Sequence, residues 1–404
     1  MPTELAYHDN PTCLEFDAEI SARVVLPDGR RGVVLPRTFF FPTGGGQEHD
    51  TGTLGDARVT EVIIDDAGMV THVVDRPILE NRVAAKIDRA RRVAFMQHHS
   101  AQHVLSAALD HALGLETVSA NINIANPATI DLAASGHAEI DLTPGENLAN
   151  AIVCEDRPIQ AYWITDAQVA TTPFRRPPKV SGAIRVIAIA TFDYSACGGT
   201  HCARTGMIGA IKIVRVERRV EKLRVHFVAG ARAFALFQTE HALVSALARQ
   251  FDTHPDALLD AITRQSDALR AAQKQLDALR ELQSQVEAQQ LIARAEVFGT
   301  LRLIVAPLAD KSAQELRALA MRLQNVPGIV ALLATFDGAK LSLVVTCASD
   351  TGVRANDLLR RQLAPINGRG GGDAKLAQGG GATSAEQFTT FFADTREHLR
   401  TLRG

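Results

Sequence analysis

The stretches His99-Ser-Ala-Gln-His103 and Cys197-Gly-Gly-Thr-His201 each carry two potential metal-binding side chains at a spacing of four. Together they supply one thiolate and three imidazoles, a donor set that suits zinc. The two stretches lie far apart in the sequence, so one shared ion would require the fold to bring them together. We therefore expect a zinc site that is built by the fold.

The segment around the first stretch is predicted to be helical. Apolar residues recur at steps of three and four across residues 88–113, and this pattern places His99 and His103 on one helix face. Alone, this spacing is weak evidence, because helical histidine pairs are often surface residues. A zinc protease would need glutamate after the first histidine, and Ser100 stands there instead.

The second stretch is predicted to be a loop between two strands. Its two glycines allow the backbone to turn Cys197 and His201 toward one point. The adjacent His98 and Cys202 should point elsewhere and are left out of the ligand set. Four protein ligands would close a tetrahedron, whereas catalysis needs an open position. Either His201 does not coordinate the zinc ion and acts as an acid–base group, or the zinc ion accepts a fifth ligand.

Length and composition indicate a chain of two to four domains, since it has 404 residues, of which 46% are hydrophobic and 22% charged. No apolar run is long enough to span a bilayer, and the first residues lack a signal-peptide pattern. The five cysteines are scattered and odd in number. We therefore expect a cytoplasmic protein without disulfides or membrane partners.

Charge is distributed unevenly, although the net charge is only −2. Residues 1–80 hold 14 acidic and 6 basic residues, whereas residues 168–226 hold 3 acidic and 11 basic residues. The basic segment is either a solvated face or a surface for a phosphate backbone. The candidates for contact with such a phosphate backbone in this segment are Arg175, Arg176, Lys179, Arg218 and Arg219.

The predicted fold class is α+β, in four segments. Residues 1–88 read as short strands of a small β-barrel, and residues 89–250 as a two-layer α/β zinc domain. Residues 251–298 form one long, coiled-coil-like helix, which pairs within the chain or in a homodimer. Residues 299–404 form a glycine-rich α/β domain that ends in a helix over 384–402.

A glycine-rich loop, Thr43-Gly-Gly-Gly-Gln47, follows an aromatic run. Its backbone can approach a ligand closely, and Gln47 can both donate and accept hydrogen bonds, although a plain hairpin turn explains it equally well. The Gly-Lys-Ser/Thr of a P-loop is missing, and so is a strand–GxGxxG–helix unit. ATP-driven and NAD chemistry are therefore not supported.

Taken together, residues 40–54, 99–103, 197–201 and 370–381 resemble the editing and C-terminal parts of alanyl-tRNA synthetases. They are also similar to the long form of the freestanding AlaX editing proteins. The resemblance covers nearly the whole chain and leaves no room for the ATP-using aminoacylation domain. With Met1 at the start and the glycine-rich tail present, we expect a freestanding protein rather than a synthetase fragment.

The resemblance implies a trans-editing hydrolase that deacylates alanine tRNA mischarged with serine or glycine. It carries the zinc-ligand role onto His99, His103, Cys197 and His201. It places Thr43, Gly45, Gly46 and Gln47 in the amino-acid pocket or near the tRNA 3′ end, with Thr43 as the contact for the serine hydroxyl. In the tail it implies tRNA contact or dimerisation, and the candidate residues there are Gly370, Gly371, Gly372 and Gln378.

Two positions depart from the family pattern. Glu48 replaces the usual proline, and Asp373 stands where a basic residue is common, which weakens the case for tRNA contact at the tail. Two other functions remain open. The chain is either a tRNA- or partner-binding module with a structural zinc ion, or another metallohydrolase that acts on small esters or amides.

Overall fold

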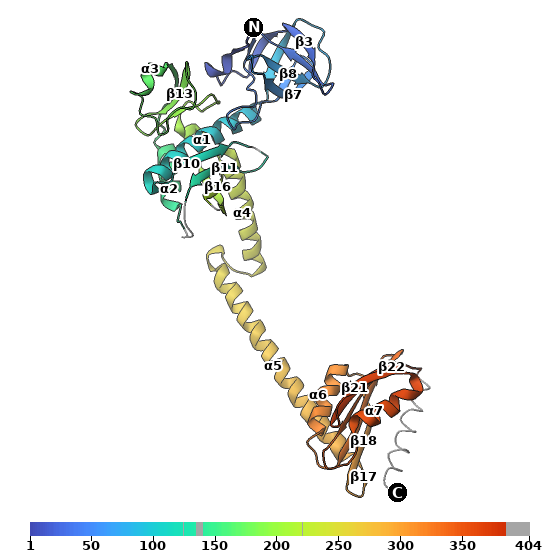
Figure 1. Ribbon diagram of the computed structural model, residues 1–404. Helices are drawn as coiled ribbons and strands as arrows, with labels where there is room; N and C mark the ends of the chain where they lie inside the picture. The colour runs from blue at the N-terminus through green and yellow to red at the C-terminus, as the bar shows by residue number, and fades with distance from the viewer. Residues whose placement is uncertain (124, 135–139, 220, 385–404) are drawn as a thin grey trace. The chain divides into compact units, whose positions relative to one another are not determined.

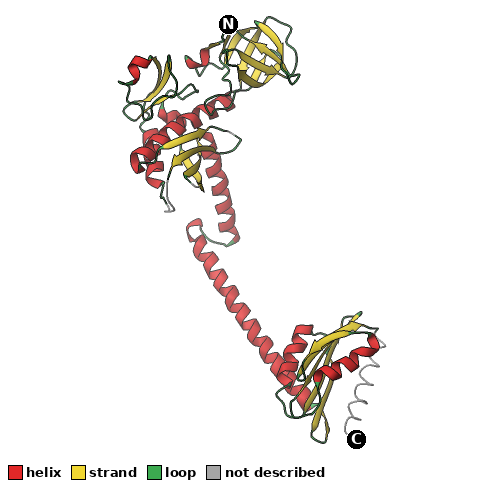
Figure 2. Cartoon of the chain, in the orientation of Figure 1, coloured by secondary structure: helices red, strands yellow, loops and turns green. Residues whose placement is uncertain are grey.

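The computed structural model describes residues 1–123, 125–134, 140–219 and 221–384, and it divides into two compact units, 1–249 and 250–404 (Figure 1). Helices and strands occur in both units, so the mixed α and β class is confirmed (Figure 2). The four predicted segments group into these two units. In the described parts of the chain, no helix is both long and apolar enough to cross a bilayer.

The first unit begins with a curled antiparallel sheet of seven strands, in the order β2-β9-β6-β7-β8-β4-β3, where a small barrel was predicted. Leu35, Phe40 and Leu54 are fully buried in its core. A short parallel pair, β1 and β5, lies outside this sheet. The bounds are β1 Glu4–Leu5, η1 Ala6–His8, β2 Glu15–Glu19, β3 Ala22–Val25, β4 Arg31–Val34, β5 Arg37–Thr38, β6 Gly52–Leu54, β7 Ala57–Ile64, β8 Val70–Val74 and β9 Arg82–Ile87.

Helix α1 (Arg89–Leu113) follows the last of these strands directly. Asp88 caps its start by accepting hydrogen bonds from two backbone amides, and Gly114 ends it at a φ of 65°. Arg92 ties the helix to the curled sheet, because its fully buried guanidinium pairs with Asp50 and donates to the Phe39 carbonyl. The helix that carries two of the predicted metal ligands is therefore fixed at its N-terminal end.

The rest of the first unit holds two further sheets, β10-β11-β16-β15 and β12-β13-β14. Helices α1 and α2 pack together, and α1 also packs against β16, so a helical layer covers the four-stranded sheet. The bounds are β10 Thr117–Asn121, β11 Ala128–Ala133, α2 Thr143–Cys154, β12 Ile159–Ile164, α3 Asp166–Val169, β13 Ile184–Ile189, β14 Asp193–Ala196, η2 Thr205–Ile208, β15 Ile211–Arg219, β16 Lys222–Ala229 and α4 Ala231–Gln250.

The second unit is a six-stranded sheet, β17-β18-β19-β20-β22-β21, with helices on both faces. Helix α7 packs on one face, whereas α6 and the end of the long helix α5 pack on the other. Gly379 lets α7 approach, because a Cβ there would lie 2.5 Å from a Leu363 methyl. The bounds are η3 Pro255–Ala257, α5 Leu258–Ala293, β17 Glu296–Phe298, β18 Leu301–Pro307, α6 Ala313–Leu323, β19 Ile329–Phe336, β20 Lys340–Cys347, α7 Ala355–Leu363, η4 Ala364–Ile366, β21 Arg369–Gly372 and β22 Leu376–Ala382.

Most predicted elements are present, including the helix over 231–250 and the long helix α5. The strand predicted to begin at Ile208 begins at Ile211, because residues 205–208 form a 3₁₀ turn. The short strand predicted at 138–142 falls partly outside the described residues. The final helix predicted over 384–402 falls outside them almost entirely.

Candidate metal centre

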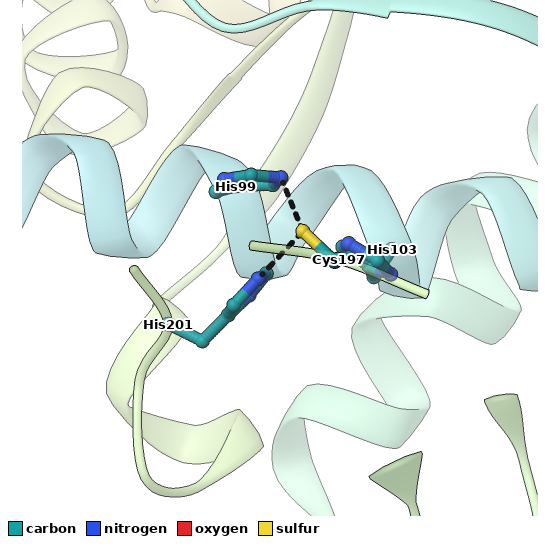
Figure 3. Close-up of side chains that lie close together, drawn as sticks. All are labelled: His99, His103, Cys197 and His201. Carbon is teal, nitrogen blue, oxygen red and sulfur yellow. Dashed lines mark hydrogen bonds between the residues drawn. The ribbon is translucent and has the colours of Figure 1, made fainter. Parts of the chain in front are cut away.

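The fold brings the two histidine-bearing stretches together. His99 and His103 point from one face of α1 toward the loop after β14, which carries Cys197 and His201 (Figure 3). The Cys197 Sγ lies 3.3 Å from the Nε2 of His99 and 3.3 Å from the Nε2 of His201. One ligand atom from each of the four residues falls within 4.8 Å of all the others, so the group could hold a metal ion.

The spacing of these four atoms suits a small tetrahedral ion. Zinc bonds of about 2.0–2.1 Å to nitrogen and 2.3 Å to sulfur separate tetrahedral ligand atoms by roughly 3.3–3.8 Å. The two sulfur–nitrogen distances already lie near that range. The three histidines are nearly buried, and buried imidazoles grouped around a thiol are a typical zinc donor set.

Each imidazole is held by a partner on its far nitrogen. His99 Nδ1 lies 2.8 Å from the Gln47 side-chain oxygen, and His103 Nδ1 lies 3.3 Å from the Asp193 carboxylate. His201 Nδ1 lies 3.3 Å from the hydroxyl of Ser100, which accepts a hydrogen bond from the backbone amide of residue 202. These contacts orient the three Nε2 atoms toward one point, as such partners do at metal-binding histidines.

Asp193 is held in turn by its neighbours. Its buried carboxylate pairs with Arg175 at 2.8 Å and accepts a hydrogen bond from the Ser195 hydroxyl at 2.9 Å. These contacts fix the carboxylate against His103, so Arg175 helps to orient the His103 ring through Asp193. Burial acts to raise the pKa of the Asp193 carboxyl, but the hydrogen bond with His103 and the charge of Arg175 outweigh it and lower the pKa.

The thiol and the imidazole of the loop are both shifted toward the forms that bind metals. Burial alone would raise the pKa of the Cys197 thiol, but the charges of His99 and His201 and hydrogen bonds from the imidazoles hold it well below its ordinary value. Burial, reinforced by His99, lowers the pKa of His201 to about 3. A thiolate beside a neutral imidazole is the state that coordinates a metal.

Close packing fixes the loop that carries these two residues. A Cβ at Gly199 would lie 2.2 Å from the imidazole of His99, so only glycine fits there without displacing that ring. Arg185, which is 5% exposed, donates hydrogen bonds to the carbonyl oxygens of Cys197 and Gly199 and so holds the loop in place. The conformation of the loop therefore depends on the buried guanidinium of Arg185 and on glycine, which has no side chain, at position 199.

A cavity of about 780 Å³ opens beside the four-residue group. Three of its wall residues are the candidate ligands His99, His103 and Cys197, and Trp163 and Lys179 also line it. A smaller cavity of about 350 Å³ lies on the other side of Cys197, between the glycine-rich loop and the 197–199 segment. Both volumes are in the range that small ligands fill.

The residues predicted for the amino-acid pocket take different positions. Gly45 lines both cavities, and Thr43 lines the smaller one. The Thr43 hydroxyl lies 2.9 Å from the His49 ring, so it already has a polar partner. The Gly46 carbonyl accepts from the Ile122 amide, which joins the loop to β10. Gln47 is 1% exposed, and its side chain contacts His99 instead of lining either cavity.

The basic residues predicted for tRNA contact divide into three groups. Arg175 and Arg176 line the larger cavity but pair with acidic residues, Asp193 and Glu116 respectively. Lys179 lines it too, is exposed, and makes no ion pair with any residue that the structure describes. The other two, Arg218 and Arg219 at the end of β15, are not among the residues that line this cavity.

The tail residues belong to the second unit. Gly370, Gly371 and Gly372 lie on the edge strand β21, and Gln378 lies on its neighbour β22. The Gln378 side-chain oxygen accepts a hydrogen bond from Arg317. A separate cavity of about 420 Å³, lined by residues including Gly370 and Gln378, opens on this part of the sheet.

Several residues of the centre were missed in the sequence. Asp193 could have been found, because β14 alternates and places Asp193 and Ser195 on the same side of the chain as Cys197. Ser100 follows a predicted ligand directly and carried no signal of its own. Trp163 and Arg185 sit on a strand pair, β12 and β13, whose register was not predicted.

Comparison with known families finds two matches. Residues 184–224 match the threonyl and alanyl tRNA synthetase second additional domain, and residues 300–401 match the DHHA1 domain. The chain is 30% identical to an alanine–tRNA ligase of Methanosarcina barkeri over 399 residues, which cover 94% of this chain and 42% of that protein. It is 33% identical to the corresponding ligase of Frankia alni over 391 residues, which cover 90% of this chain and 43% of that protein.

The chain thus spans about two fifths of the length of these relatives. Among solved structures, the C-Ala domain of Aquifex aeolicus alanyl-tRNA synthetase is 29% identical, with a TM-score of 0.24. That match covers 26% of this chain and 97% of the solved domain. The predicted relationship to alanyl-tRNA synthetases is confirmed by the sequence matches.

Proposed function

Because this chain is an AlaX-like homologue of the alanyl-tRNA synthetases, with their second additional domain and a DHHA1 domain, we propose that it is an editing hydrolase of alanine tRNA. Its substrate is the ester that joins a wrong amino acid, serine or glycine, to the 3′ end of that tRNA. It acts in trans, on tRNA released by a synthetase, in the cytoplasm. The observation that carries the proposal is the four-residue group at the wall of an open cavity.

Zinc is the metal we propose for this group, with His99, His103, Cys197 and His201 as its ligands. Bound there, zinc would polarise the ester or a water molecule next to it. The donor set supports zinc over harder ions, since thiolate and imidazole ligands disfavour magnesium and calcium. The cavity wall supports catalysis over a purely structural role, because three of the four residues line an open space.

The chain's own residues supply the positioning. Gln47 and Asp193 hold the rings of His99 and His103, so the donor atoms are in place before substrate arrives. Arg185 donates hydrogen bonds to the carbonyl oxygens of Cys197 and Gly199 and so holds the loop that carries the thiol. Lys179 is available for a phosphate of the RNA, as an exposed cation at the same cavity.

Amino-acid selection is proposed for the smaller cavity beside Cys197, where Thr43 lies. An editing site must accept serine and refuse alanine, which lacks one hydroxyl. A buried polar group that bonds to the serine hydroxyl loses its partner when alanine enters, and such a loss can reach about 10⁴-fold in discrimination. The Thr43 hydroxyl, which is exposed in this structure and lies 2.9 Å from the His49 ring, is the polar group we propose for this contact, and the bound substrate would have to bury it.

The second unit has an accessory role in this proposal, as a contact for tRNA or for a second copy of the chain. Helix α5 exposes a row of apolar side chains, including Leu269, Leu276 and Leu279. Leu269 and Leu276 are seven residues apart and Leu279 follows three residues later, as the a and d positions of a heptad repeat do. A homodimer through this helix or through the glycine-rich sheet would be detected by light scattering of the purified chain.

The decisive experiment is deacylation of seryl-tRNA(Ala) by the full chain. We expect hydrolysis by the native protein and loss of nearly all of it in Cys197→Ala, with Cys154→Ala, an exposed cysteine elsewhere, as the matched control. Correctly charged alanyl-tRNA(Ala) should survive. Binding of tRNA without hydrolysis would indicate the binding module instead. Hydrolysis of small esters but not of seryl-tRNA(Ala) would indicate a different metallohydrolase.

A further inference from the structure

Trp163 is a large aromatic side chain that the fold leaves exposed to solvent. It is the one tryptophan of the chain, and 51% of its surface is accessible. It lines the 780 Å³ cavity beside the metal-ligand group and also a second cavity of about 470 Å³. The indole thus forms a wall that the two cavities share.

The strand that carries Trp163 explains why the indole is not covered. Strand β12 is an edge strand, paired only with β13 among the described strands. Alternation places Ile159, Ala161 and Trp163 on one face, and all three line the 470 Å³ cavity. Among the residues that the structure describes, the ring packed on the indole is that of His8, edge-on, with ring centres 5.5 Å apart. A large part of the indole surface is therefore free to receive a ligand.

The surroundings of the indole define what kind of ligand fits. The cavity is lined by the candidate metal ligands His99, His103 and Cys197 and also by the exposed Lys179. Under the proposed function, a ligand that fills the cavity therefore brings an ester near the metal and a negative charge near Lys179. A flat ring would gain most from the indole face. A single-stranded RNA end combines a base, a phosphate and a terminal ester within one or two nucleotides.

We propose that Trp163 is a stacking platform for an unpaired base at the 3′ end of the RNA whose aminoacyl ester reaches the metal centre. The proposal rests on the proposed function, because it takes the RNA end as the ligand of the cavity. It adds a binding residue from β12, a strand that contributes none of the four candidate ligands. Stacking on an indole accepts any base, so this contact would hold the end without reading its sequence.

The first test uses tryptophan fluorescence, excited at a wavelength that tyrosine does not absorb, so that the emission reports on Trp163, the one tryptophan of the chain. Uncharged alanine tRNA is added, and the same tRNA lacking its last three nucleotides serves as the comparison. We expect the intact tRNA to quench the emission and the shortened tRNA to leave it unchanged. Equal responses to the two tRNAs, or no response to either, would overturn the proposal.

The second test measures steady-state deacylation of seryl-tRNA(Ala). Trp163→Ala should raise KM about tenfold or more while kcat changes little, because base–aromatic stacking of this kind typically contributes that much to binding. Trp163→Phe keeps an aromatic face and should recover most of the loss. The matched control is Tyr162→Ala, since Tyr162 is 38% exposed on the same strand but does not line these cavities. Its KM should stay at the native value.

The two tests separate this proposal from the proposed function. The fluorescence titration needs no hydrolysis, so quenching by intact tRNA in a chain that hydrolyses nothing would support stacking and refute the hydrolase. Hydrolysis with an unchanged KM in Trp163→Ala and no quenching would support the hydrolase and refute stacking. A KM raised equally by Trp163→Ala and Tyr162→Ala would assign the effect to the strand and overturn the proposal.

Discussion

Replacing Gly199 with alanine should disable the metal centre without removing any of its ligands. A Cβ at this position would lie 2.2 Å from Cε1 and 2.4 Å from Nδ1 of His99, and 3.0 Å from the Gln47 side-chain oxygen. Ordinary van der Waals contact begins near 3.4 Å, so the shortest contact falls short by about 1.2 Å. The His99 ring or the loop must move by about that distance.

This displacement is large compared with the tolerance of a metal site, in which bond lengths vary by about ±0.2 Å. The ring also loses its hydrogen bond to Gln47, since the new methyl group points at the same pair of atoms. Disturbing only an outer partner of a metal-binding histidine typically lowers affinity about 10- to 100-fold. We therefore expect Gly199→Ala to lower zinc affinity by at least 100-fold or so.

The neighbouring glycine provides the matched control. A Cβ at Gly198 would meet nothing closer than the His8 ring, at 3.9 Å, and neither glycine has a positive φ. Zinc affinity is measured by competition with a chromogenic chelator, and circular dichroism checks that both variants fold. We expect Gly198→Ala to bind zinc like the native chain. Folded Gly199→Ala protein with the zinc affinity of Gly198→Ala would refute the reasoning.

Three further predictions follow from buried polar groups. Asp193→Asn removes the charged partner of His103 and should lower zinc affinity about 10- to 100-fold in the same chelator assay; native affinity would contradict this role. Arg92→Met leaves the Asp50 carboxylate buried without its partner and should lower the free energy of unfolding by about 3–5 kcal/mol in a urea titration; a loss of less than about 1 kcal/mol would be inconsistent with that pairing. Burial lowers the pKa of His72 to about 4, so between that pH and about 6.5 the unfolded chain binds a proton that the folded chain does not. The free energy of unfolding is therefore highest above pH 6.5 and falls toward pH 4, by about 2 kcal/mol between pH 7 and pH 5. His72→Gln should flatten that part of the measured profile of unfolding free energy against pH.

Local patterns in the sequence allowed the clustering of His99, His103, Cys197 and His201 to be predicted, and the structure brings these four side chains together. Two histidines four apart in a helical pattern must share a face, and the two glycines at 198–199 made a tight loop the natural interpretation. What the sequence could not supply was the partner of each ring. Gln47 reaches His99 from the glycine-rich loop, 52 residues earlier in the chain, and only the tertiary packing brings them together.

The same limit applies to the strands. The long helix was predicted over 251–298 but spans Leu258–Ala293, because a 3₁₀ turn over 255–257 precedes it and residues 296–298 form strand β17. The edge strand β12 was missed, because four consecutive exposed residues lack the alternation of buried and exposed positions that identifies a strand. Trp163 lies on that strand, so its position at the cavity beside the four-residue group could be found only in the folded protein.

The hydrogen bonds of Gln47 have a consequence for any attempt to divide this protein. The side chain belongs to the glycine-rich loop between β5 and β6, yet its oxygen lies 2.8 Å from His99 and its amide donates to Thr200 at 3.0 Å. A fragment cut after residue 88 would keep all four candidate ligands and lose the group that clamps the two halves of the centre. A fragment intended to bind metal at these four residues should therefore include the glycine-rich loop.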